Sequence, residues 1–155
     1  MSLRYSIMAA RPQAFRWDSD EAAARVIAAV EPGARLRRFD GPERFDILPL
    51  LVCTDGAVRM FGREVRRLRP NLLVDDVEEN AERAWEDASL RLPDAEVRLA
   101  DLRARCVMTT YDPDTADQDS QVLRDIVRRF DGRLCLNAFV TRGGWIRDGD
   151  PVGIF

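Results

Sequence analysis

The sequence predicts a β-rich α+β domain whose strands could close into a barrel. Short apolar or alternating runs recur along the chain and are separated by Gly, Pro and Asp, which is typical of strands joined by turns. Apolar residues at helical spacing stand out in two segments, 19–30 and 120–130. With 155 residues, of which 46% are hydrophobic, the chain can bury a core of its own. We therefore expect one domain over residues 1–155, with a few helices outside the sheet.

Both predicted helices carry signals at their ends. The first has Asp18 or Ser19 as its cap, and Pro32-Gly33 ends it. The second has a single apolar stripe and ends at Gly132. That stripe consists of Val122, Leu123, Ile126, Val127 and Phe130.

The first half of the chain offers two extended segments. Residues 47–53 are apolar and predict a buried strand, which Asp55-Gly56 should end with a turn. Residues 65–75 should be extended as well, with a proline that indicates an edge position or a strand end. The acidic segment 75–82 should begin a loop or a short helical turn around Trp85.

The second half predicts a series of strands and turns. Residues 89–92 and 95–99 alternate and should form a hairpin. Residues 106–110 are expected to be the next strand, followed by a turn at 112–115. Strands over 134–142 and 145–152 should form a hairpin around Gly143-Gly144.

The composition restricts the chemistry. All 24 basic residues are arginine, and there is no histidine. This excludes a pyridoxal phosphate attached to this chain, a P-loop lysine and every Ser-His or Cys-His pair. The net charge of −3 argues against nucleic-acid binding. No apolar run is long enough to cross a membrane and no leader signature is present, so we expect a cytoplasmic protein without membrane association.

Cys106 is the first candidate for chemistry, because Arg103 and Arg105 flank it. Nearby cations stabilise a thiolate, the form that binds soft metals or carries sulfur. On a strand, Cys106 would share a face with Met108 and Thr110. The alternative is a buried structural cysteine, which is the commoner role of a free thiol. Three widely spaced cysteines without a CxxC pair indicate neither a zinc site nor a disulfide framework.

The remaining two cysteines, Cys53 and Cys135, lie in apolar runs, and we expect them to be buried and structural. A second candidate site is Arg69-Pro70-Asn71. In an extended segment, Arg69 and Asn71 would point to the same face and form a clamp for an anionic ligand. The alternative is a surface arginine beside a turn asparagine.

Taken together, four segments resemble the MOSC domain, the module named after the C-terminal part of molybdenum-cofactor sulfurases. Their order along the chain is that of the family. They are residues 67–74 with Arg-Pro-Asn, 105–115 with Arg-Cys followed by Thr-Thr and Asp-Pro-Asp-Thr, 137–140 and 146–152. The resemblance extends from about residue 45 to 152 and implies a MOSC-type β-barrel, with 1–44 as an atypical N-terminal segment.

The resemblance also implies a site for a molybdopterin-type cofactor. Cys106 would ligate molybdenum, and Arg69 and Asn71 would contact the pterin or its phosphate. The other cofactor contacts implied by the matching segments are Arg105, Thr109, Thr110 and Asn137. In other members of the family the cysteine is thought to carry sulfur as a persulfide. A lysine-containing motif of longer members has no counterpart here, because the chain contains no lysine.

Three functions follow from this resemblance. The first is reduction of N-hydroxylated or N-oxide small molecules, with an external electron-transfer protein as partner. The second is a sulfur carrier without catalysis, in which Cys106 cycles between thiol and persulfide and a cysteine desulfurase is the partner. The third is a stand-alone binding domain. For the first two we expect Cys106, Arg69 and Asn71 to line one shared cleft that is open to solvent.

Overall fold

The computed structural model describes residues 2–5, 15–39, 41 and 47–155. The chain divides into two compact units, one formed by Met1–Ser6 with Ile47–Phe155 and the other by Ile7–Asp46. The smaller unit contains α1 (Asp20–Ala29), which confirms the first predicted helix. Ser19 is its cap, since its hydroxyl accepts a hydrogen bond from the Ala22 amide at 3.2 Å.

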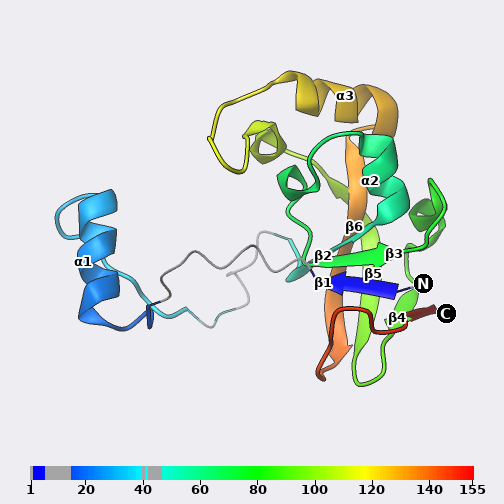
Figure 1. Cartoon of the computed structure of the whole chain (residues 1–155), viewed down its shortest axis with the longest axis horizontal. Coiled ribbons are helices and arrows are strands. Elements are labelled where there is room, and N and C mark those ends of the chain that lie inside the picture. Colours follow the sequence, from blue (N-terminus) through cyan, green and yellow to red (C-terminus); the bar gives the residue numbers. More distant parts are fainter. Residues whose placement is uncertain (1, 6–14, 40, 42–46) are drawn as a thin grey trace. The chain divides into compact units, whose positions relative to one another are not determined.

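Within the described residues, the larger unit is built on one curled, half-barrel sheet of seven strands (Figure 1). The strand order in this sheet is β1-β3-β2-β6-β5-β4-β7, and among these described strands only β2 and β3 pair in parallel. The strands are β1 (Ser2–Tyr5), β2 (Leu50–Thr54), β3 (Leu72–Asp75), β4 (Ser89–Arg91), β5 (Glu96–Ala104), β6 (Arg133–Arg142) and β7 (Gly153–Ile154). The predicted mixed, β-rich α+β fold is therefore confirmed, as is the hairpin formed by β4 and β5.

Alternating side chains of the central strands feed two apolar clusters. Val52, Leu136 and Ala138 belong to one, which is closed by the β4–β5 hairpin and the C-terminal segment. Leu51, Cys53 and Cys135 belong to the other, together with residues of α2 (Asp55–Phe61) and α3 (Gln121–Phe130). Both helices lie on the same side of the sheet in Figure 1. Cys53 and Cys135 are fully buried, as expected.

Helix α3 confirms the second predicted helix, although only part of its apolar stripe is buried. Val122, Ile126 and Phe130 are in the core, whereas Val127 is 57% exposed. The predicted turn at Asp55-Gly56 is wrong, because α2 begins there. The Thr54 hydroxyl accepts a hydrogen bond from the Ala57 amide at 3.0 Å and caps the new helix.

Two predicted extended segments are wrong at the candidate site. Residues 65–67 form a 3-10 helix, η2 (Val65–Arg67), and Arg69 has a φ of 55°, so the strand begins only at Leu72. Residues 107–110 form another 3-10 helix, η4 (Val107–Thr110), in place of a strand. Thr109 and Thr110 stabilise it, since each hydroxyl donates a hydrogen bond to the carbonyl three residues earlier.

The predicted strand over 145–152 is also wrong. Gly144 packs against the backbone of Asp94, which directs the chain away from β6. A turn follows, in which the amide of Arg147 donates to the Asp150 carboxylate at 2.7 Å. The last strand, β7, then pairs with β4. The short helical turn expected before Trp85 is present as η3 (Ala81–Ala84).

Candidate functional site

Cys106 lies where β5 has ended and η4 begins, and its side chain is exposed. Its carbonyl accepts hydrogen bonds from the amide of Thr109 at 3.1 Å and from the Thr109 hydroxyl at 2.9 Å. Thr109 and Thr110 are themselves only 1% exposed. Their hydroxyl protons are used by the backbone, so these threonines shape the turn that presents the thiol.

Arg105 points to the opposite side, under the helices. Its amide donates to the Gly132 carbonyl at 2.8 Å and its guanidinium to the Leu68 carbonyl at 2.6 Å. Its Nε atom is buried and, within the described part of the chain, has no hydrogen-bond partner. Burial lowers the pKa of Arg105, although the thiol groups of Cys135, Cys53 and Cys106 counteract this. Arg105 is therefore a half-buried cation within electrostatic range of three thiols.

Arg69 and Asn71 do not form the expected parallel pair. The side-chain oxygen of Asn71 accepts a hydrogen bond from the backbone amide of Leu51 at 2.8 Å. The backbone amide of Asn71 donates to the Leu51 carbonyl at 2.9 Å. Asn71 thus connects the start of β3 to β2. Arg69 is exposed, and within the described residues its side chain has neither a hydrogen bond nor an ion pair. This guanidinium is available to an anion.

Asn137 occupies the centre of β6 and is only 1% exposed. Its carbonyl oxygen accepts from Arg103 at 2.9 Å, and its amide nitrogen donates to Asp101 at 3.0 Å. Both ends of the side chain are therefore engaged within the protein. The asparagine orients these two charged residues of β5 at the rim of the sheet.

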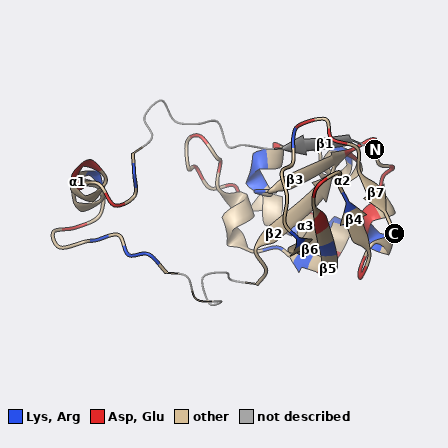
Figure 2. Cartoon of the chain, turned by 90° about the horizontal axis from the view of Figure 1, so that it is seen from below, with Lys and Arg blue, Asp and Glu red and all other residues tan. Residues whose placement is uncertain are grey.

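A set of arginines that the sequence analysis did not identify holds the loop after Cys106 in place. Arg63, Arg66 and Arg67 form ion pairs with aspartates of this loop and of α3. We call these residues the arginine clamp, in which Arg63 binds Asp119 and Asp125, Arg66 binds Asp114, and Arg67 binds Asp112. Figure 2 shows both basic and acidic positions on the larger unit. In the sequence, the signal for these ion pairs was a cluster of arginines at 63–67 and a series of aspartates at 112–125.

The clamp affects the ionisation of its aspartates. Backbone amides of Asp114 and Thr115 lower the pKa of Asp112, and Arg67 lowers it further. Arg66 lowers the pKa of Asp114, and Arg63 lowers that of Asp125. These carboxylates stay charged at neutral pH, so the ion pairs fix the loop that follows Cys106.

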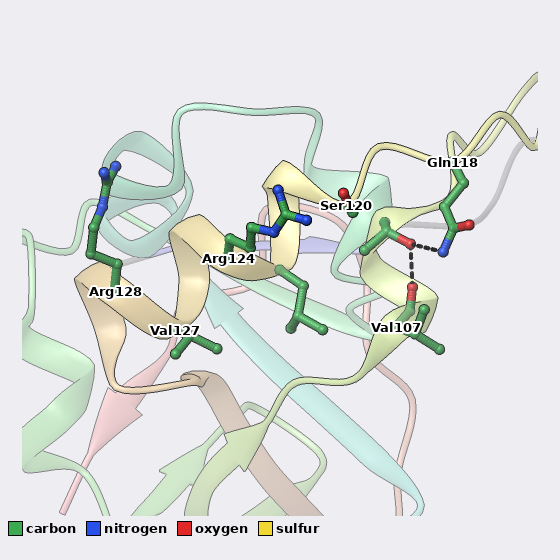
Figure 3. Close-up of a pocket in the computed structure, with 8 residues that line it drawn as sticks. Val107, Gln118, Ser120, Arg124, Val127 and Arg128 are labelled. Carbon is green, nitrogen blue, oxygen red and sulfur yellow. Dashed lines mark hydrogen bonds between the residues drawn. The ribbon is translucent and has the colours of Figure 1, made fainter.

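A groove of about 440 Å³ lies between η4 and α3 (Figure 3). Val107, the residue after Cys106, contributes to it together with Leu123 and Val127 of the helix. Gln118 donates a hydrogen bond to the hydroxyl of Thr110 at 3.2 Å at one end of this groove. The remaining lining residues are Ser120, Arg124 and Arg128.

A second groove of about 290 Å³ contains Asn71 and lies between β3, the β4–β5 turn and the end of β6. Cys106 and Arg69 line neither groove, so the described residues do not show the single shared cleft that we expected. The hydrogen bond from Arg105 to Leu68 does bring the Arg69 segment next to the Cys106 segment. The candidate site therefore consists of Cys106, Arg105 and Arg69, with the first groove beside it.

Comparison with known proteins finds sequences that are similar to this chain. A family model described as "MOSC domain" matches residues 57–153. Mitochondrial amidoxime reducing component 2 is 29% identical over 128 residues in Homo sapiens and 27% in Macaca fascicularis. Each alignment covers 69% of this chain and 37% of the relative, so the chain spans well under half of these proteins.

A solved structure shares the fold. The crystal structure of the YuaD protein from Bacillus subtilis superposes with a TM-score of 0.54 at 16% identity, covering 71% of this chain and 65% of the other. At this identity the likeness concerns the fold alone. Among the described helices, none has the length and apolar character needed to cross a bilayer.

Proposed function

Because the chain belongs to the MOSC domain family, we propose that it binds a molybdopterin-type molybdenum cofactor through the thiolate of Cys106. The observation that carries this proposal is the exposure of Cys106 at the N-terminus of η4, near Arg69, whose side chain has no partner among the described residues. A soft, accessible thiolate suits molybdenum, and a free guanidinium suits the phosphate of the cofactor.

The donor set fits such a cofactor at its metal end. The described residues contain no cluster of three metal-binding side chains, so Cys106 would be a single protein ligand beside the dithiolene sulfurs. Arg69 would bind the phosphate. The Asn71 side-chain oxygen, the hydroxyl protons of Thr109 and Thr110 and both ends of the Asn137 side chain are engaged in the protein, so we assign these residues the positioning of their segments.

As an enzyme, the protein would reduce N-hydroxylated or N-oxide small molecules. The bound cofactor supplies two-electron oxygen-atom transfer, and an external electron-transfer protein returns the electrons. The chain itself holds the Cys106 side chain exposed just beyond the end of β5, where a ligand can reach it. The groove beside η4 provides an apolar surface for the substrate, with Val107 adjacent to the thiol.

The first experiment is expression in a host that makes molybdenum cofactor, followed by elemental analysis and pterin fluorescence of the purified protein. We expect molybdenum in the wild type and a loss of at least about tenfold in Cys106→Ala, because removing even a residue that supports a metal ligand costs about 10–100-fold in affinity. The pterin fluorescence of purified Arg69→Ala should be lower than that of the wild type. Met108→Leu is the matched control, because Met108 is a second exposed sulfur on the same 3-10 helix.

Absence of molybdenum from the wild type, or equal loading of Cys106→Ala, would contradict the proposal. The exposure of the thiol also favours one alternative, a sulfur carrier that receives a persulfide from a cysteine desulfurase. Cyanide-releasable sulfur after incubation with a desulfurase separates the two. Sulfur that is present in the wild type, absent from Cys106→Ala and found without molybdenum supports the carrier.

A further inference from the structure

The most unusual feature away from the candidate site is the contact between Cys53 and Cys135. Their sulfur atoms are 2.9 Å apart, and both residues are fully buried. This separation lies between a disulfide bond of about 2.05 Å and the ordinary contact of two thiols. The Cys135 thiol donates to the Cys53 sulfur, which in turn donates to the Thr54 carbonyl at 3.8 Å.

The strand pairing places the two residues where a disulfide can form. In the antiparallel pair of β2 and β6, Val52 lies opposite Leu136, and Cys53 and Cys135 are the next residues of the two strands beyond this pair. Adjacent antiparallel strands bring residues within the range of Cα separations that a disulfide bridges. The contact between the two sulfurs shows that the side chains already point toward each other.

A β-bulge aims the Cys135 side chain. Between the pairs Leu102–Leu136 and Ala104–Arg133, β6 has one residue more than β5. Cys135 has a φ of 65°, a conformation that glycine usually provides in a bulge. Leu134 and Cys135 consequently both face the cluster under the helices. A buried non-glycine residue in this conformation costs free energy, and such strain is concentrated at functional positions.

Arg105 adds a third observation. Its guanidinium is half-buried, its Nε is buried without a hydrogen-bond partner among the described residues, and it lies within electrostatic range of both sulfurs. The hydrogen bond with Cys135 and burial raise the pKa of the Cys53 thiol, so a nearby cation is the group that can offset the cost of forming the thiolate that begins oxidation. The core therefore holds two neighbouring thiols with a cation beside them.

From this geometry we propose that Cys53 and Cys135 form a redox-active dithiol that hydrogen peroxide converts to a disulfide between β2 and β6. One sulfur attacks a peroxide oxygen and the O–O bond breaks, which yields a sulfenic acid and water. The second sulfur then attacks the first, the S–O bond breaks and a second water leaves. The two sulfurs together lose two electrons, and the peroxide is reduced to two waters.

The test uses the full chain carrying Cys106→Ser, so that the exposed thiol cannot take part and the result does not depend on the proposed cofactor. The protein is treated with hydrogen peroxide, unfolded, alkylated and digested without reductant. Mass spectrometry should find a peptide with residue 53 linked to one with residue 135. Both thiols should become alkylatable again after dithiothreitol.

A thermal melt gives a second measurement, because a bond across 82 residues should raise the melting temperature of the oxidised form. Persistence of both thiols at peroxide doses that fully oxidise Cys106 in the wild type would overturn the proposal. So would overoxidation of either cysteine without a linked peptide, or a link between different chains on a non-reducing gel. Wild-type protein blocked at Cys106 by brief alkylation in the folded state serves as the control for the substitution.

Discussion

At the scale of the residue, the Thr54 hydroxyl has two partners. It accepts from the Ala57 amide, which caps α2, and donates to the buried carboxylate of Glu82 at 3.2 Å. Thr54 is fully buried and Glu82 is 2% exposed. One hydroxyl therefore joins β2, α2 and η3, on the strand that also carries Cys53.

Replacing Thr54 with valine should remove both bonds at nearly constant volume. The lost cap costs about 1 kcal/mol and the unsatisfied carboxylate about 1–3 kcal/mol, so we expect about 2–4 kcal/mol less stability. Urea denaturation monitored by tryptophan fluorescence measures this change. Thr54→Ser keeps the hydroxyl and should lose much less, and equal losses in the two variants would show that packing dominates.

The surroundings of Cys106 could be predicted from the sequence only in part. The exposure of Cys106 argues against the buried structural role that the residues left open, but Arg105 is directed to Leu68 and the residues after Cys106 do not lie on a strand. Alternation of apolar and polar residues cannot reveal that two threonine hydroxyls will bond to carbonyls three residues earlier. The positive φ of Arg69 likewise depends on how η2 ends, which residue spacing alone does not encode.

At the scale of the element, the arginine clamp ties η2 to the loop after Cys106. Asp112 is central, since its carboxylate accepts from the amides of Asp114 and Thr115 at 3.0 and 3.1 Å and pairs with Arg67 at 2.7 Å. Its pKa is lower in the folded protein than in the unfolded chain. Its contribution is therefore complete above the unfolded pKa of about 3.9 and is lost as the pH falls through the folded pKa.

Asp112→Asn should consequently be less stable than the wild type at pH 7, and the difference should shrink below about pH 4. Urea midpoints of both proteins between pH 7 and pH 3 provide the comparison. Asp117→Asn in the same loop is the control, because Asp117 has no ion pair with any residue that the structure describes. If the difference in urea midpoint between the two proteins does not change with pH, the negative charge of Asp112 is not what stabilises the folded protein.

The segment after β6 provides a second test at this scale. A Cβ on Gly144 would collide with the backbone of Asp94, whereas a Cβ on Gly143 would have no atom within 4 Å. Gly144→Ala should lower stability by about 1–3 kcal/mol, the usual cost of overpacking, and Gly143→Ala should change little. Chemical denaturation of the two variants decides this. Equal effects would indicate that chain stiffness rather than close packing matters here.

These elements also show what the sequence could predict. Helices α1 and α3 and the β4–β5 hairpin carry caps, periodicity and turn residues in neighbouring positions, so local rules were sufficient. The missed helix α2 depends on Thr54 acting as a cap instead of ending a turn. Strand β7 pairs with β4, more than sixty residues earlier, after Gly144 has redirected the chain. Such contacts are set by tertiary packing.

At the scale of the whole molecule, the chain interrupts one sheet with a separate unit. Residues 2–5 pair with β3 as β1, and the larger unit resumes at Ile47. The family model begins at residue 57, after this interruption. The expectation of a single domain over 1–155 can therefore be tested by removing the smaller unit, Ile7–Asp46.

The sheet itself indicates how the ends could be joined. Tyr5 lies opposite Leu72, and Leu72 lies opposite Val52. Since neighbouring strands are about 4.8 Å apart, Tyr5 and Val52 are separated by about 10 Å. Ile47 precedes Val52 in the chain, so the linker in place of 7–46 has to reach somewhat further, and about six Gly and Ser residues, which extend to roughly 20 Å, are sufficient. The shortened chain should keep its sheet, both apolar clusters and a single cooperative transition.

The measurement is far-ultraviolet circular dichroism during heating, with the full chain as reference. We expect the melting temperature of the shortened chain to lie close to that of the full chain, because the described residues of both clusters come from 47–155. Loading with molybdenum in the same expression host gives an independent readout of the candidate site. A shortened chain that fails to fold would show that residues 7–46 belong to the same cooperative unit as the sheet.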